Sequence, residues 1–377
     1  MANDWDLHNH LINRQGSRQA LNTPVLVIDA DALKRNIATM SAFARDKGIH
    51  LRPHAKTHKN VNIAKLQIEA GALGICCAKI GEAEALAEGG IQSILITSPV
   101  VTPQAISRVA ELHERIADLR IVADDPEIAA YTAMMLNDAE RPLPMLIDID
   151  PGIHRTGVAS PEAAVALARQ ISSDPALRYT GVQFYCGAQQ HLERYADRRA
   201  AIEERTAYLQ TVIDALRSAD FAPEMITGGG TGTHRIDAAL GLLNELQVGS
   251  YVFMDKQYAD CDLSGEGAAP FEAALFVDTS VVSANSPGMG TLDAGFKALS
   301  TDGGSPQVID GAPSSTAFFF MGDEHSALIG HTFKAGDRVI LSPPHCDPTV
   351  DRYDYYHVVR DGTLIDIWPV HARGRSR

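Results

Sequence analysis

The amino-acid sequence predicts an α/β protein in which a (β/α)8 TIM barrel is followed by a second, mainly antiparallel β domain. Up to about Gln257, short runs rich in Val and Ile alternate with helical patterns, which is typical of parallel strands joined by crossover helices. A polar, glycine-containing segment follows at 258–270, and beyond it the helical patterns fade while strand patterns succeed one another. Among these, the pair Asp361–Gly362 is a strong hairpin signal.

The strands predicted for the barrel follow one another in steady succession, with helices between them. The helix around 209–216, for example, places Leu209, Val212, Ile213 and Leu216 on one face. The predicted strands are 25–29, 50–55, 74–78, 93–97, 120–124, 145–150, 181–185, 224–229 and 245–250. This is one strand more than a closed eight-stranded barrel needs, so the first or the last should lie outside it. Strands of the β domain are expected within 274–282, 337–344 and 357–368.

Composition and charge exclude several classes of protein. The chain has 377 residues, 45% of them hydrophobic, and it contains no apolar run of the roughly 18 residues that a membrane span needs. Its formal net charge of −14 argues against a nucleic-acid partner, because binding to phosphate backbones needs a basic surface. The amino terminus lacks the pattern of a secretory signal, and the five cysteines form no CxxC spacing. We therefore expect a cytoplasmic protein.

Lys56 is the first candidate functional residue. It follows the predicted strand 50–55 at its carboxyl end, which is the side of a barrel where chemistry gathers. A lysine partly withdrawn from water near other cations, here Arg52 and Lys59, would have its neutral amine favoured, as a Schiff-base nucleophile requires. Taken alone, the position fits a solvated loop lysine better than a nucleophile.

A glycine-rich turn suggests a phosphate site. Segment 228–233 has four glycines in six positions at the end of a predicted strand, and 247–251 adds Gly249 and Ser250 at the end of the next. Successive backbone N–H groups without side chains can cradle a phosphate, and barrels commonly use the loops after their last strands for this purpose. A glycine turn without a ligand is the plain alternative. Together with Lys56, the turn suggests pyridoxal phosphate.

Further candidates come from three other segments. Arg155 follows the strand 145–150 and could hold the phenolate oxygen of such a cofactor, while Tyr185 ends the strand 181–185 and could face its ring. His345 and Asp347 stand at i and i+2 and would project to one side of an extended segment, as two ligands of a divalent metal. The alternatives are a surface arginine, a core tyrosine and a turn aspartate.

Several motifs together resemble one family. They are TPVLVID (23–29), RPHAKTHK (52–59), GICCAK (74–79), the stretch 152–158, GGGTG (228–232), NELQVGSYVFMD (244–255), LDAGFKA (292–298), DEH (323–325), HCDPT (345–349) and WPVHARG (368–374). The resemblance is to the D-threonine aldolase family, which also contains D-serine dehydratases and hydroxyaspartate-cleaving enzymes, and it runs almost from end to end.

The resemblance implies an alanine-racemase-like architecture and a set of roles. The strand 25–29 would join the β domain, so that the barrel spans 31–257 and the β domain comprises 1–30 plus 258–377. Lys56 would be the Schiff-base lysine, Arg155 would contact the phenolate of the cofactor and Tyr185 would lie at its pyridine nitrogen. The phosphate-binding residues would be Gly230, Thr231, Gly249 and Ser250, and the metal ligands His345 and Asp347.

The resemblance also implies a function. It is the cleavage of a D-β-hydroxy-α-amino acid, such as D-threonine, to glycine and an aldehyde, with Lys56, His345 and Asp347 as catalytic residues. Aldolases resemble His-x-Asp at the metal motif and favour Mn²⁺ or Mg²⁺, whereas the dehydratases resemble His-x-Cys and use Zn²⁺, which stays possible here. The alternatives are a dehydratase acting on D-serine or D-threo-3-hydroxyaspartate, a racemase, and a non-catalytic carrier of pyridoxal phosphate. Family members are commonly homodimers.

Overall fold

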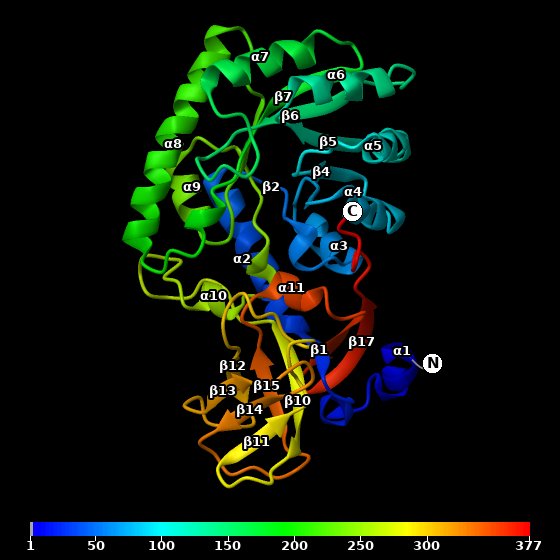
Figure 1. Ribbon diagram of the computed structural model, residues 1–377, viewed down its shortest axis with the longest axis vertical. Helices are drawn as coiled ribbons and strands as arrows, with labels where there is room; N and C mark the ends of the chain where they lie inside the picture. The colour runs from blue at the N-terminus through cyan, green and yellow to red at the C-terminus, as the bar shows by residue number, and fades with distance from the viewer. Residues whose placement is uncertain (1–2) are drawn as a thin grey trace.

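The computed structural model describes residues 3–377 and shows two sheets at opposite ends of an elongated molecule (Figure 1). One is an eight-stranded parallel sheet and the other is a nine-stranded, mainly antiparallel sheet. The predicted fold class is therefore confirmed. The division at 31–257 against 1–30 plus 258–377 stays a prediction, and Met1 and Ala2 lie outside the described residues.

The parallel sheet runs in the order β2-β9-β8-β7-β6-β5-β4-β3. An isolated parallel bridge between His54 and Cys76 joins its two ends, and the Cys76 N–H donates to the carbonyl of Pro53. The strands are β2 (His50–Leu51), β3 (Ile75–Cys77), β4 (Ser93–Ile96), β5 (Asp118–Ala123), β6 (Leu143–Asp148), β7 (Leu177–Phe184), β8 (Met225–Gly228) and β9 (Glu245–Leu246). Their apolar side chains are nearly all buried because helices cover the outside of the barrel.

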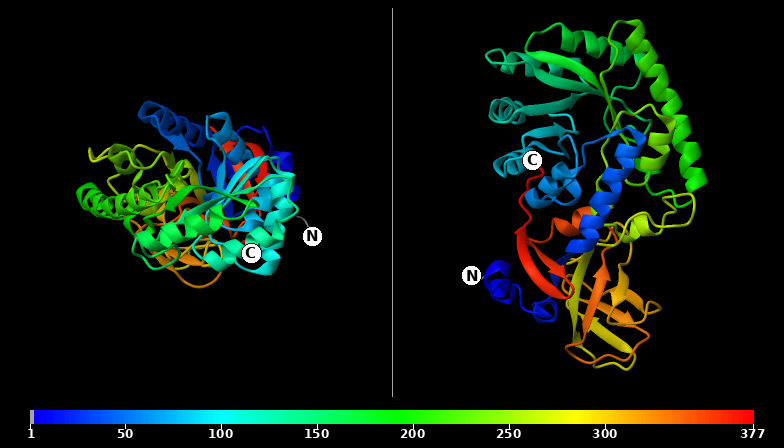
Figure 2. Two further views of the ribbon diagram at one scale, coloured as in Figure 1. Left: turned by 90° about the horizontal axis from the view of Figure 1, so that it is seen from above. Right: turned by 180° about the vertical axis from the view of Figure 1, so that it is seen from behind.

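Helices alternate with these strands, as Figure 2 shows from above and from behind. Their starts follow local chemistry: Asp29 caps the first of them, and Pro103, Pro126 and Pro161 occupy first positions of others, where the missing N–H costs nothing. The helices of the barrel are α2 (Ala30–Lys47), α3 (Val61–Glu69), α4 (Ile80–Glu88), α5 (Pro103–Arg115), α6 (Pro126–Met135), α7 (Pro161–Ser172), α8 (Tyr195–Ser218) and α9 (His234–Leu240).

The second sheet has the main order β13-β14-β11-β10-β1-β16-β17, with β15 paired to β10 and β12 paired to β15. Its strands are β1 (Val25–Asp29), β10 (Leu275–Ser283), β11 (Met289–Leu292), β12 (Gln307–Asp310), β13 (Ala317–Phe320), β14 (Ser326–Ile329), β15 (Arg338–Ser342), β16 (Tyr355–Arg360) and β17 (Thr363–Pro369). The strand β1 pairs with β10 and β16, so the spare strand is the first one. The predicted hairpin joins β16 to β17, and both Asp361 and Gly362 have the positive φ that its turn requires.

Short helices complete the chain outside these layers. They are α1 (Asp4–His8), η1 (Asn9–Leu11), η2 (Ser17–Ala20), η3 (Ala55–Thr57), η4 (Gly187–Gln189), η5 (Ser250–Val252), α10 (Lys256–Ala259) and α11 (Cys346–Val350). Among residues 3–377, no helix is long and apolar enough to cross a membrane.

The strand predicted at 50–55 is wrong in its second half. The regular strand ends at Leu51. The N–H groups of Arg52 and His54 still donate to the carbonyls of Leu246 and Val248 in the β9 segment, whereas Pro53 has no N–H to donate. The chain then turns into η3, where the His54 side chain accepts a hydrogen bond from the Lys56 N–H. Lys56 thus lies in a short turn beyond the strand and still faces the carboxyl-end side of the barrel.

Candidate active site

A cavity of about 620 Å³ opens at the carboxyl ends of the barrel strands. Segments that follow seven different strands contribute to its wall, namely the residues after β2, β3, β4, β5, β6, β7 and β9. Lys56, Arg155 and Tyr185 all line it. The structure therefore brings together three of the residues singled out in the sequence.

Lys56 is held by a carboxylate from the other sheet region. Its ammonium Nζ forms an ion pair with Oδ2 of Asp347, a residue 291 positions away in the chain. Burial alone would lower the pKa of Lys56, but the Asp347 carboxylate, together with Tyr185, raises it above its usual value. The expectation of a depressed pKa is therefore wrong for the free lysine, because the sequence did not show that a carboxylate would face it.

His345 and Asp347 sit where a short helix begins, so the expected extended segment is not there. His345 is the N-cap of α11 and Asp347 lies in its first turn. Nδ1 of His345 lies 2.6 Å from Oδ2 of Asp302, so Nε2 is the ring nitrogen that remains available to bind a ligand. Burial would raise the pKa of Asp347, but the ammonium of Lys56 and the nearby His345 hold it well below its usual range. Cys346, between them, is fully buried.

Two histidines that the sequence analysis left without a role stand beside this pair. His54 Nε2 lies 3.0 Å from the Thr97 hydroxyl, and burial together with Lys56 holds the pKa of His54 well below its usual value. Burial and the charges of His345 and Lys56 likewise lower the pKa of His191. Both imidazoles are therefore neutral near pH 7. His54 stands in the quoted motif RPHAKTHK, and that position was the available signal.

Arg155 and Tyr185 contact each other across the cavity wall. The guanidinium carbon of Arg155 lies 5.6 Å from the centre of the Tyr185 ring, within the range of a cation–π contact. Their strands, β6 and β7, are neighbours in the barrel, which explains why two residues 30 positions apart meet. Such a contact fixes the ring and leaves the guanidinium edge available to an anionic group.

The glycine-rich segments 228–233 and 247–251 lie next to the segment that carries Lys56. Glycine is needed there for close approach: a Cβ on Gly232 would come within 2.0 Å of the Gln190 carbonyl oxygen, and one on Gly249 within 2.8 Å of the Thr57 hydroxyl. Thr231 accepts a hydrogen bond from the Tyr251 N–H, which ties the two loops together. Gly230, Thr231, Gly249 and Ser250 are buried together, although they do not line the cavity of about 620 Å³ itself.

Two buried glutamines, Gln183 and Gln247, line the cavity, and the sequence analysis did not identify them. Gln183 donates to Oδ1 of Asp148 at 2.9 Å and to the Thr97 carbonyl, and Gln247 donates to Oε1 of Gln183 at 3.1 Å. Burial raises the pKa of Asp148 to about 6. The available signal was glutamine within strands that are otherwise apolar, because a buried amide must find partners.

Comparisons with known proteins agree with this geometry. The family described as "Alanine racemase, N-terminal domain" matches residues 28–257, and a serine dehydratase domain family matches residues 274–359. The chain is 38% identical to the 3-hydroxy-D-aspartate aldolase of Paracoccus denitrificans (strain Pd 1222), over 94% of this chain and 93% of that protein. The crystal structure of D-threonine aldolase from Filomicrobium marinum matches with a TM-score of 0.91 at 35% identity, covering 94% of this chain and 97% of that one.

The chain belongs to the D-threonine aldolase family. A more distant relative is the D-threo-3-hydroxyaspartate dehydratase of Delftia sp. (strain HT23), with 27% identity over 94% of this chain and 98% of that protein. Membership implies pyridoxal phosphate and a divalent metal as cofactors.

The residues present fit pyridoxal phosphate. The N–H groups of Gly249 and Ser250 and the hydroxyl of the buried Thr57 form no hydrogen bond among residues 3–377, so three donors beside Lys56 are free to meet a phosphate. Lys56 and Arg155 line the adjoining cavity, where an amine and a cation are needed. The donors for the phosphate group and the residues for the pyridoxal end would therefore be held close together, around η3.

The residues also fit a divalent metal, with two protein ligands. Oδ1 of Asp347 is buried and has no hydrogen-bond partner among the described residues, and the Asp302 carboxylate orients the His345 ring as outer partners of metal ligands do. Within residues 3–377, no group of three or more His, Cys, Asp or Glu side chains is placed to hold a metal ion. Water or substrate would have to supply the other ligands.

Proposed function

We propose that this protein catalyses the retro-aldol cleavage of D-β-hydroxy-α-amino acids of the D-threonine type to glycine and an aldehyde. Relatives named as aldolases at 35–38% identity support the reaction type. The observation that carries the proposal is the contact between Lys56 and Asp347, because it joins the candidate Schiff-base lysine and the candidate metal ligand in one site. A protein that only carried pyridoxal phosphate would gain nothing from that carboxylate.

Each residue has a definite task in this proposal. Lys56 would hold pyridoxal phosphate, with Arg155 and Tyr185 against its ring and Gly230, Thr231, Gly249 and Ser250 at its phosphate. When bound, pyridoxal phosphate supplies an electron sink for the bond between Cα and Cβ. His345 and Asp347 would hold a divalent ion, and the carboxylate favours Mn²⁺ or Mg²⁺ over Zn²⁺ as the Lewis acid. Nε2 of His345, oriented through Nδ1 by Asp302, would be the ring nitrogen that binds this ion.

The test is a product assay on the purified protein with D-threonine, pyridoxal phosphate and Mn²⁺. We expect glycine and acetaldehyde with metal, and loss of both after chelation or in Asp347→Ala. Loss should exceed roughly 100-fold, because a Lewis acid contributes several kcal/mol of transition-state stabilisation. Asp323→Ala, which removes an exposed carboxylate elsewhere in the β region, is the matched control. Formation of 2-oxobutanoate and ammonia would replace the aldolase with the dehydratase.

We also propose the remaining sequence expectations as properties of the protein. They are a homodimer, a cytoplasmic location and the division into a barrel of 31–257 and a β domain. Gel filtration and limited proteolysis around 258–270 test the first and the last.

A further inference from the structure

One buried side chain from another segment is inserted into the glycine turn (228–233). This side chain is Gln190, which follows η4 and is fully buried. Its Oε1 accepts the Gly232 N–H at 3.0 Å, and its Nε2 donates to the Thr233 hydroxyl at 3.0 Å and to the Cys186 carbonyl at 3.2 Å. The oxygen and both N–H groups of the amide are therefore used, and its orientation is fixed.

Two glycines of the turn are needed because Gln190 lies so close to them. A Cβ on Gly230 would come within 2.5 Å of Oε1 of Gln190, and one on Gly232 within 2.0 Å of its carbonyl oxygen. Neither of these glycines has a positive φ, so their backbone conformation does not require glycine. Gln190 and the two glycines therefore form one packed unit.

The same contacts decide which N–H group of the turn remains for a ligand. The Gly232 N–H is bonded to Gln190, and the Gly230 N–H is bonded at 3.2 Å to the Thr233 hydroxyl, which also accepts from Gln190. The N–H of Thr231, between them, forms no hydrogen bond within residues 3–377. Because the peptides on both sides are fastened, the direction of the Thr231 N–H is fixed.

Thr231 also joins the turn to the second glycine-containing segment, 247–251. Its hydroxyl oxygen accepts the Tyr251 N–H at 3.0 Å, and the Thr231 carbonyl accepts from Nδ1 of His234 at 2.8 Å. The N–H groups of Gly249 and Ser250, just before Tyr251, form no hydrogen bond among the described residues either. Two segments tied together at Thr231 thus offer three unused N–H groups, and such groups can cradle a phosphate.

We propose that Gln190 is a positioning residue for the cofactor phosphate, because it holds the glycine turn in the shape that presents the Thr231 N–H to that phosphate. The proposal rests on the placement of the phosphate in the proposed function. Gln190 does not touch the phosphate itself, since all hydrogen-bonding groups of its amide are used within the protein. None of these bonds reaches Lys56 or Arg155, so the effect of Gln190 is confined to the phosphate end of the cofactor.

The test compares pyridoxal phosphate with pyridoxal, which lacks only the phosphate, in binding to the cofactor-free protein. The dissociation constant of each is measured from the absorbance change on binding, and their ratio isolates the contribution of the phosphate. In Gln190→Met the preference for pyridoxal phosphate should fall roughly 10-fold, because a hydrogen bond to a charged group is misdirected. The Kd of pyridoxal should change less than about twofold. A general loosening of the site would weaken both ligands and leave their ratio unchanged.

Two further variants complete the test. Gln189→Met makes the same change one residue earlier, in a half-buried side chain that forms no hydrogen bond within residues 3–377, and should leave the ratio unchanged. Gln190→Glu covers the case that Gln190→Met does not fold. It keeps the shape of the side chain and an acceptor for Gly232 but loses the N–H groups that bond Thr233 and Cys186, so the ratio should fall here too.

The outcomes separate this inference from the proposed function, because the binding measurement needs no cleavage. If the ratio falls in the Gln190 variants while D-threonine is not cleaved by the wild type, the proposed reaction fails and the role of Gln190 stands. If a folded Gln190 variant keeps the wild-type ratio, or Gln189→Met loses it equally, the inference fails whatever the activity shows. If the wild type binds pyridoxal as tightly as pyridoxal phosphate, the placement of the phosphate fails and the role of Gln190 fails with it.

Discussion

Lys56 and Asp347 set each other's charge. The side chain of Lys56 is partly buried and would favour the neutral amine on that account, yet the carboxylate opposite keeps it protonated. The low pKa of Asp347 stabilises the fold above the usual carboxyl pKa, and this contribution is lost as the pH falls through the lowered value. The raised pKa of Lys56 also stabilises the fold, and this contribution is lost only as the pH rises above the usual lysine pKa and through the raised value.

The pair predicts how Lys56 reacts in the cofactor-free protein. In Asp347→Asn, the largest charge that opposes the effect of burial is removed, so the pKa of Lys56 should fall and its neutral amine should become more abundant. Reductive methylation at about pH 8 in the presence of a chelator should then modify Lys56 several times faster than in the wild type. Mass spectrometry of the digested protein measures the rate, and exposed Lys34 in the same sample is the internal control. An unchanged rate at Lys56 would mean that Asp347 does not control its charge.

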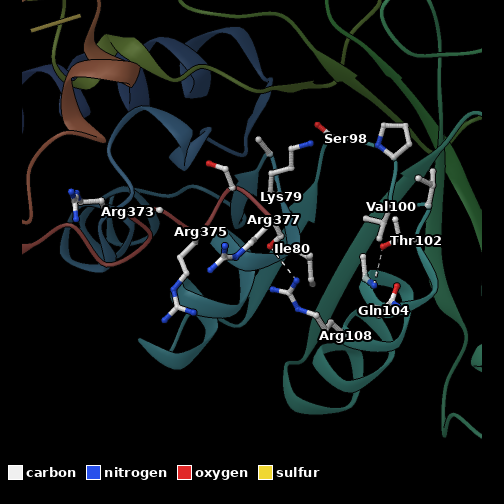
Figure 3. Close-up of a pocket in the computed structure, with 16 residues that line it drawn as sticks. Lys79, Ile80, Ser98, Val100, Thr102, Gln104, Arg108, Arg373, Arg375 and Arg377 are labelled. Carbon is white, nitrogen blue, oxygen red and sulfur yellow. Dashed lines mark hydrogen bonds between the residues drawn. The ribbon is translucent and has the colours of Figure 1, made fainter. Parts of the chain in front are cut away.

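At the scale of elements, the sequence predicted what depends on local patterns. The positions of the barrel strands and the hairpin at Asp361–Gly362 follow from runs of apolar residues and from turn chemistry. The helical start at Cys346 did not, because it depends on contacts made elsewhere in the chain. Cys346, for instance, donates its N–H to Asp255, which lies 91 residues earlier. The pocket of about 740 Å³ that segment 373–377 lines (Figure 3) could not be predicted for the same reason.

The turn between β8 and α9 predicts a pH-dependent stability. The Thr233 hydroxyl donates to Asp237 at 2.6 Å and accepts from the Gly230 N–H and from Gln190, so Asp237 supports the whole glycine turn. Burial raises the pKa of Asp237 from 3.8 to about 7. The folded protein therefore binds more protons than the unfolded chain between these values, and its stability falls as the pH rises through them.

Asp237→Asn should remove this dependence while it keeps an acceptor for Thr233. We expect the stability of the variant relative to the wild type to be about 3 kcal/mol greater at about pH 8 than at about pH 5. Thermal unfolding at the two pH values measures the difference. Asp220→Asn, which changes an exposed carboxylate, should show no such trend. Equal stability of Asp237→Asn and wild type at both values would contradict the raised pKa.

At the scale of the whole molecule, the site exists because the second sheet and the barrel dock at the lysine segment. Residues that follow Lys56 are held from the other sheet region: the Tyr356 hydroxyl donates to the His58 carbonyl at 2.6 Å, and Asn60 donates to the Pro369 carbonyl. Lys59 forms a buried ion pair with Glu82 in α4 and lies 3.6 Å from Asp351, beyond α11. The same docking brings α11, and with it Asp347, to Lys56.

Tyr356→Phe tests this docking with the loss of one oxygen atom. Tyr356 is fully buried, so its removal leaves the His58 carbonyl without a partner and should cost about 1–3 kcal/mol. The midpoint of thermal unfolding should fall by a few degrees. Tyr355→Phe removes the same atom one residue earlier, from a half-buried side chain whose hydroxyl forms no hydrogen bond within residues 3–377, and should leave the midpoint unchanged. Because η3 carries Lys56, Tyr356→Phe should also lower kcat for D-threonine, whereas Tyr355→Phe should not. If the two variants behave alike, the contact between Tyr356 and His58 does not hold Lys56 in place.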